Sequence, residues 1–271
     1  MIEMRKVIFA FILGMIVGSG VFLVPKTITK SPEINGQMFI GRQDIYYAGY
    51  PGDVIELHVY WIRKMGNMSA VYGVRDLPKC LNLLTIVPSH DIIGEGIEEY
   101  KFIILLQLRK EGKCIADDAK FVLRSGNIEV KIPMRIVAYG VKESGKLRVD
   151  TSKVAEIGSE GKLDGSRLEY EIYNPTNSTV YIKGVRVEIP GIRVVDFSPF
   201  EIPPKTSRVL TFALKDERST KTNIVFIRPL LLYTIDSKTI EMPLGEYRFE
   251  IIPSYNDVIR LLSDKTLVIV K

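Results

Sequence analysis

The chain has 271 residues, of which 46% are hydrophobic and 25% charged. These fractions are typical of a folded protein and exclude a largely disordered one. The net charge is only +5, and the basic residues are interspersed with acidic ones, as in residues 215–221 (KDERSTK). A nucleic-acid-binding protein gathers its lysines and arginines along one stripe, so we expect no nucleic-acid partner.

The chain is poor in glutamine, which occurs only at Gln37, Gln43 and Gln107, whereas Lys, Glu, Ile and Val are abundant. Few thermolabile amides combined with many mixed charges are typical of proteins from hot environments. The composition therefore favours a thermophilic source.

Residues 7–24 (VIFAFILGMIVGSGVFLV) form an uncharged stretch directly after Arg5 and Lys6. A helix of this length would be about 27 Å long, close to the roughly 30 Å of a bilayer's hydrocarbon core. Basic flanks tend to stay in the cytoplasm. We therefore expect a cytoplasmic head (1–6), a single transmembrane anchor (7–24), a stalk (25–40) and a body outside the cytoplasm, which places the protein in the cell membrane.

A cleaved secretory signal is the alternative to an anchor. Such a signal has a shorter apolar stretch, followed by a small-residue cleavage site. No Ala-x-Ala follows residue 24, although Gly18, Ser19 and Gly20 leave cleavage within the stretch open. In a retained anchor, Gly14 and Gly18 form a G-x-x-x-G motif that allows two helices to approach closely. Glycine is also common in membrane helices in general, so the motif leaves open whether the chain forms a homo-oligomer.

The body of the chain contains short runs in which apolar and polar residues alternate. In residues 53–62, Ile55, Leu57, Val59 and Trp61 would lie on one face of a strand and Glu56, His58 and Tyr60 on the polar face. Residues 128–132 and 167–172 show the same alternation. The one helical stripe lies in residues 254–265, where Val258, Leu261 and Leu262 share a face.

A stretch rich in charge, Gly and Ser (139–166) separates two such blocks. Strands that recur every 8–12 residues without intervening helices favour antiparallel sandwiches. The sequence therefore predicts an all-β fold with two tandem antiparallel β-sandwich domains, at residues 41–145 and 146–271.

The strand and turn chemistry of three segments resembles immunoglobulin-like domains of secreted bacterial and archaeal proteins. The segments are YPGDVIELHVYW (50–61), LEYEIYNPTNSTVYIKGVRVEIPG (168–191) and EIPPKTSRVLTFAL (201–214). The resemblance implies immunoglobulin-like sandwiches and no particular ligand, because one sandwich hosts many functions.

The cysteines and histidines are few: Cys80, Cys114, His58 and His90. An even number of cysteines in an exported region predicts one disulfide, Cys80–Cys114, with two separate buried thiols as the alternative. Their spacing matches no zinc, copper or haem motif, so we expect no metal and no cofactor.

No catalytic motif is evident either. Residues 88–92 (PSHDI) place Ser, His and Asp side by side, but the members of a triad come from distant parts of a chain, so we expect a loop there. We interpret the acidic residues Glu95, Glu98, Glu99, Asp117 and Asp118 as solvated loop charges. Asn67 and Asn177 begin N-x-[S/T] sequons in predicted turns, where a glycan would be tolerated.

These features favour a membrane-anchored, extracytoplasmic, non-catalytic protein that acts as a structural, assembly or adhesion component of the cell surface or of a membrane complex. Its expected partners are the membrane and other surface proteins. Two alternatives remain open: an exported hydrolase or its accessory subunit, which uses scattered carboxylates, and a soluble secreted binding protein released by signal cleavage.

Overall fold

The computed structural model describes residues 36–67, 69–94, 96–142, 146–157, 163–218, 224–250, 253–264 and 267–270. Residues 34–271 form one compact unit. The expected anchor, its Gly14 and Gly18, and most of the expected stalk lie outside the described residues. No helix within those ranges is long and apolar enough to cross a membrane.

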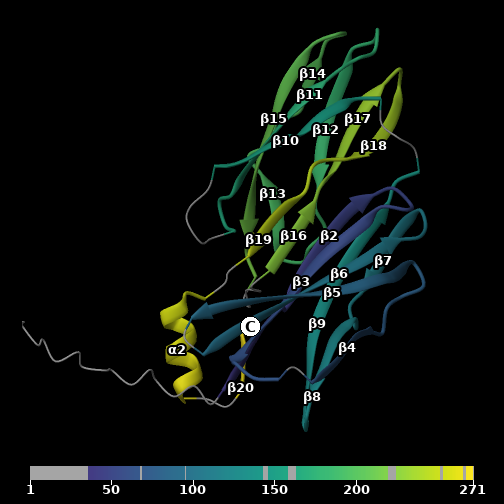
Figure 1. Ribbon diagram of the computed structural model, residues 1–271. Helices are drawn as coiled ribbons and strands as arrows, with labels where there is room; N and C mark the ends of the chain where they lie inside the picture. Colours follow the sequence, from purple (N-terminus) through teal and green to yellow (C-terminus); the bar gives the residue numbers. More distant parts are fainter. Residues whose placement is uncertain are drawn as a thin grey trace, which may run out of the picture. The chain divides into compact units, whose positions relative to one another are not determined.

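Two sheets form the first lobe (Figure 1). Sheet I consists, in order of pairing, of β20 (Leu267–Val270), β1 (Gln37–Ile40), β3 (Val54–Lys64), β6 (Ile97–Leu108) and β5 (Leu81–Gly94). Sheet II consists of β19 (Tyr247–Glu250), β16 (Ile224–Arg228), β2 (Gln43–Gly49), β9 (Ile128–Gly140), β8 (Lys120–Ser125) and β4 (Ala70–Arg75), with β7 (Gly112–Ala116) also paired to β9. Their facing side chains form one core, in which Trp61, Phe102 and Phe121 are almost fully buried.

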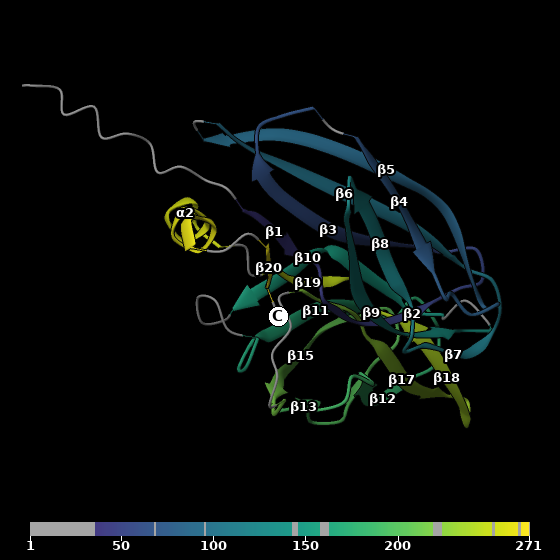
Figure 2. The ribbon, with the colours of Figure 1, turned by 90° about the horizontal axis from the view of Figure 1, so that it is seen from below.

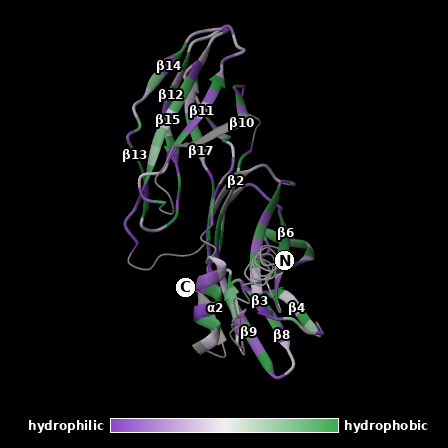
Figure 3. Cartoon of the chain, turned by 60° about the vertical axis from the view of Figure 1, so that its left-hand side comes forward, coloured by the Kyte–Doolittle hydropathy of each residue, from purple (hydrophilic) through white to green (hydrophobic). Residues whose placement is uncertain are grey.

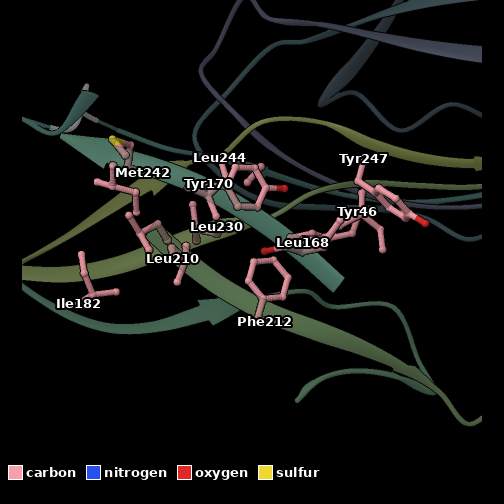
Figure 4. Packing of buried hydrophobic residues seen from close by; sticks show 14 of the residues in the cluster. Tyr46, Leu168, Tyr170, Ile182, Leu210, Phe212, Leu230, Met242, Leu244 and Tyr247 are labelled. Atoms are coloured by element: carbon pink, nitrogen blue, oxygen red, sulfur yellow. The ribbon is translucent and has the colours of Figure 1, made fainter. Parts of the chain in front are cut away.

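Two further sheets form the second lobe. Sheet III is β10 (Arg148–Ile157), β11 (Arg167–Tyr173), β15 (Ser207–Asp216) and β13 (Ile192–Val195). Sheet IV is β14 (Phe200–Ile202), β12 (Val180–Arg186), β17 (Leu230–Ile235) and β18 (Lys238–Pro243). Tyr170 and Phe212 stack in its core with their ring centroids 6.0 Å apart (Figure 4).

The chain changes sheets between β1 and β2, because β1 pairs with β3 in sheet I and β2 pairs with β9 in sheet II. Gly41 lies at this crossing. A Cβ atom there would lie 3.1 Å from a methyl carbon of Val59 and 3.2 Å from one of Ile132, so the crossing is packed around a residue without a side chain.

One long hairpin joins the two lobes. β17 and β18 pair in sheet IV, and the same two chain segments continue past Pro229 and Leu244 as β16 and β19, which pair in sheet II. β16 also pairs in parallel with β2. Tyr46 of β2 and Tyr247 of β19 contribute to the core of the second lobe (Figure 4), so the two cores meet through this hairpin.

The C-terminal residues return to the first lobe. Helix α2 (Tyr255–Asp264) begins after Ser254, whose Oγ accepts a hydrogen bond from Asp257 N at 3.3 Å, as in an N-cap. Val258 and Leu262 pack against the outer face of β1 and β3. β20 then pairs in parallel with β1 (Figure 2).

The prediction of a nearly all-β chain is confirmed, and hydrophobic and hydrophilic residues alternate along its strands (Figure 3). Leu168, Tyr170 and Ile172 share a buried face, and the predicted helix forms. The sheets are mainly antiparallel, as predicted, and three pairs are parallel: β2 with β9, β2 with β16, and β1 with β20. Strands β16, β19 and β20 follow the expected boundary between residues 145 and 146, but they pair in the sheets of the first lobe.

Candidate functional site

The outer face of β3 carries the densest group of polar side chains near the junction of the lobes. Glu56, His58 and Tyr60 point away from the first core, and β19 adds Arg248 and Glu250. His58 Nδ1 lies 2.9 Å from Glu250 Oε1, and His58 Nε2 lies 2.6 Å from Glu56 Oε1. The Tyr60 hydroxyl donates to Glu250 Oε2 at 2.7 Å. We call these five residues the His58 cluster.

Arg248 completes the cluster. Its Nη1 lies about 3 Å from both ring nitrogens of His58, at 3.0 and 2.9 Å, and its Nη2 donates to the Glu56 carbonyl at 3.0 Å. The guanidinium also lies 5.0 Å from the centre of the Phe226 ring, within range of a cation–π contact. Arg248 therefore joins β19 to both the backbone and the side chains of β3.

The electrostatics keep both carboxylates ionised. The hydrogen bond with His58 lowers the pKa of Glu56, and Arg248 adds to the effect. Burial alone would raise the pKa of Glu250, but the hydrogen bonds with His58 and Tyr60 outweigh it and leave that pKa lowered. Burial, together with the adjacent Glu250, raises the pKa of Tyr60, so its hydroxyl stays protonated.

The His58 cluster is arranged to hold two strands together. Both ring nitrogens of His58 are engaged by carboxylates within the fold, one from β3 and one from β19. His58 lies on the polar face of β3, as predicted, but it is only 4% exposed. β19, about 190 residues further along the chain, covers that face.

A second histidine lies on β5. His90 Nε2 is 3.2 Å from Glu98 Oε2, and Arg63 Nε is 2.8 Å from Glu98 Oε1. The expectation of a loop at residues 88–92 is wrong, since these residues lie within β5. Glu98 is not a solvated loop charge either, because it is 2% exposed and its burial is compensated by Arg63.

A hollow of about 630 Å³ is lined by β2, β9 and the turns near Gly191 and Arg218. Arg218 Nη1 lies 2.6 Å from Asp44 Oδ2, and Arg135 Nε lies 3.0 Å from Asp117 Oδ1. Opposite charges are thus paired along its walls. Within the described ranges, no group of three or more His, Cys, Asp or Glu side chains is arranged to hold a metal ion.

The other predicted site residues are also placed. A disulfide joins Cys80, just before β5, to Cys114 in β7, with their Cα atoms 6.0 Å apart. Asn67 and Asn177 are exposed outside the strands. Gly14 and Gly18 lie outside the described residues.

The first lobe has a long strand with one free edge. Among the described strands, only β6 pairs with β5. Leu84 and Val87 of β5 are each 46% exposed, although large apolar side chains are normally buried. The sequence analysis did not predict this edge. Pro88, within an apolar run, could have indicated it, because proline within a sheet is confined to edges and bulges.

No protein-family model matches the chain, and no curated protein does either. Among solved structures, a protein of unknown function from Porphyromonas gingivalis W83 aligns over 79% of this chain and 99% of its own, with 12% identity and a TM-score of 0.27. The YadV chaperone aligns over 79% and 99%, with 13% identity and a TM-score of 0.21. Domains 5–6 of the S-layer protein SbsC align over 82% and 99%, with 15% identity and a TM-score of 0.22. At these scores the likenesses carry no conclusion about function.

Proposed function

We propose that this protein is a membrane-anchored, extracytoplasmic, non-catalytic component of the cell surface or of a membrane complex. The anchor at residues 7–24 holds the two-lobed body at the membrane. Tethering of this kind raises the local concentration of the body relative to its partners. The lobes then act through strand edges and faces.

The observation that carries this proposal is that the two histidines bond to carboxylates of the fold, whereas large apolar side chains are exposed. His58 and His90 are both bonded to carboxylates within the fold. In contrast, large apolar side chains are exposed on strands of both lobes, with Val71 75% and Val209 59% exposed. Exposed apolar surface favours protein contacts.

We also propose that each lobe is an immunoglobulin-like sandwich. In the first lobe, the order β1-β3-β6-β5 faces the order β2-β9-β8-β4. Lettered in chain order from A, A′ and B, with β7 left without a letter, these sheets are A-B-E-D and A′-G-F-C, which matches the immunoglobulin arrangement of an A-B-E-D sheet facing strands C, F and G. In the second lobe, β10-β11-β15-β13 has the same A-B-E-D order when β14, an edge strand of the other sheet, is left without a letter.

Membrane fractionation followed by affinity capture in mild detergent tests the proposed function. We expect a protein of full mass in the membrane fraction that requires detergent for extraction, and a partner in fixed stoichiometry identified by mass spectrometry. A soluble, shortened protein would contradict the anchor. Hydrolytic turnover of surface polymers by the isolated chain would contradict the non-catalytic role.

A further inference from the structure

We infer that β5 is a self-association edge, at which two copies of the chain pair their β5 strands antiparallel about Thr85. The inference deepens the proposed function by naming a second copy as one partner. It rests on three features of the first lobe: a free strand edge, exposed apolar side chains on that edge, and opposite unpaired charges at its two ends.

The open part of the edge is short and defined. Arg109 N donates to Cys80 O at 2.9 Å, which sets which residues of β5 face β6 up to the register shift between Leu83 and Thr85, where the alternation changes. Three outward N–H positions are unavailable: Leu81 N donates to Pro78 O, Pro88 has no N–H, and Ile92 N donates to Asp91 Oδ1 at 2.8 Å. Between these positions, the backbone groups of residues 82–87 that do not bond to β6 remain open for pairing.

Apolar side chains line the same stretch. Leu84 and Val87 are each 46% exposed. On the outer face of sheet I, Val87 lies beside Ile103 of β6, and Thr85 lies beside Leu105. Both β6 residues are half-buried. A second β5 strand would cover this apolar strip.

One end of β5 is basic. Arg75, Lys79, Arg109 and Lys110 are exposed, and none of them forms an ion pair within the described ranges. Leu81 pairs with Leu108, so Lys79 and Lys110 lie opposite each other where the ladder would continue. The Cys80–Cys114 disulfide holds these two turns together. Two acidic residues lie nearby: Glu111 is exposed, and Asp76 is bound to Lys120 at 3.5 Å.

The other end of β5 is acidic. Asp91 and Glu99 are cross-strand partners on the outer face, and like charges placed opposite each other destabilise a sheet. Lys101 is the neighbouring cation, and its ammonium lies 5.7 Å from the Tyr60 ring. Burial, together with Asp91, raises the pKa of Glu99, as expected for a carboxylate short of a cation.

Antiparallel pairing about Thr85 places the two charged ends against each other. Residues 79 and 91 are equally far from residue 85, so the basic end of each copy lies against the acidic end of the other. The two ends lie roughly 40 Å apart along a strand that rises about 3.4 Å per residue. Such an isologous contact closes on itself, because each copy offers one β5 edge.

A cysteine placed at the centre of the pair tests the geometry. The experiment uses the full chain in mild detergent, with Gly14→Ile and Gly18→Ile in every variant so that the anchor cannot pair. In a twofold antiparallel pair, Thr85→Cys faces its own copy, and we expect an oxidised, covalent dimer. Ser89→Cys, four residues along the same strand, is the matched control: it should still associate but form no covalent dimer. The inference would be overturned if the two cysteine variants cross-linked equally, or if Thr85→Cys did not cross-link at all.

Charge reversal tests the partner. We expect Lys79→Glu with Lys110→Glu to weaken dimerisation, measured by light scattering, by about tenfold or more, and Asp91→Lys with Glu99→Lys to do the same. Combining all four substitutions should restore the dimer. Self-association would be refuted if the parent chain, which carries only the two anchor substitutions, stayed monomeric. It would also be refuted if the combined variant dimerised as weakly as each double variant. These readouts do not depend on membrane location or on other partners, so the proposed function can fail separately.

Discussion

At the scale of single residues, Asn174 explains how the chain turns after β11. Its side chain is fully buried, and Nδ2 donates to the carbonyls of Ser178 (2.9 Å), Ile202 (3.0 Å) and Pro203 (3.2 Å). Its Oδ1 accepts from Thr176 N at 3.0 Å. One amide thus supplies the hydrogen bonds that the backbone of this turn cannot make for itself.

Asn174→Ala should therefore lower the free energy of unfolding by about 2–4 kcal/mol, because it leaves buried carbonyls without donors. Urea denaturation measures the loss. Asn177→Ala, in the same turn but exposed, is the control and should change stability by less than about 0.5 kcal/mol. Equal effects of the two variants would contradict the assigned role of Asn174.

Gly140 lies where two parts of the backbone approach closely. A Cβ atom there would collide with the backbone of Lys110 and Glu111. Backbone atoms cannot rotate away, so we expect Gly140→Ala to destabilise the protein by about 1–3 kcal/mol in thermal unfolding. Gly73→Ala, where no atom lies within 4 Å of the new Cβ, should be neutral or slightly stabilising. If Gly140→Ala were as stable as the native protein, the turn at Lys110 and Glu111 would be able to move away from the new Cβ atom.

At the scale of elements, the His58 cluster makes the attachment of β19 depend on pH. Glu56 and Glu250 have lowered pKa values in the folded protein. Groups of this kind add stability above their unfolded pKa of about 4.3, and this stability is lost as the pH falls through the folded pKa.

We therefore expect the melting temperature to fall on acidification below about pH 4.5 more steeply in the native protein than in a Glu56→Gln, Glu250→Gln variant. Circular dichroism melts between pH 3 and pH 7 measure the difference. Asp76→Asn, which removes one partner of an exposed pair with Lys120, is the control and should follow the native profile. Identical acid profiles for the native protein and the double variant would exclude the cluster as the source.

The disulfide joins segments 34 residues apart. In the chain-entropy model, a loop of this length contributes about 4 kcal/mol. Replacing both cysteines by alanine should lower the unfolding free energy by roughly that amount, measured in guanidinium chloride without reductant. Adding reductant should destabilise the native protein and leave the double variant unchanged. Two free thiols titrated in the denatured native protein would contradict the bond.

At the scale of the whole described unit, the hairpin from β16 to β19 binds the lobes to each other. It forms part of sheet IV at one end and of sheet II at the other. Tyr46 and Tyr247 bring side chains of sheet II into the second core. Neither lobe can lose its strands without exposing part of the other core.

The described unit should therefore unfold in one cooperative transition. Phe212→Ala in the second core should shift the whole calorimetric transition to lower temperature, with a loss of about 3–5 kcal/mol. Phe102→Ala in the first core should shift the same single transition. Two separate transitions, of which a variant moves only one, would show that the lobes unfold independently.

Much of the secondary structure could be predicted, because strand and helix periodicity is local. Leu168, Tyr170 and Ile172 alternate with polar residues, so one face of β11 had to be buried. The helix likewise followed from the spacing of Val258 and Leu262. The burial of His58 and Glu98 could not be predicted, because the groups that cover and pair with them come from other strands.

The sequence alone determined that the chain is nearly all-β, which residues of most strands face a core, and which two cysteines were available to bond. These properties depend on neighbouring residues or on composition. Only the tertiary structure decided that β16, β19 and β20 return to the first lobe, that His58 fastens β19 to β3, and that β5 keeps a free edge. Such pairings join residues up to about 230 positions apart, and strand periodicity states which face of a strand is apolar, not which strand lies beside it.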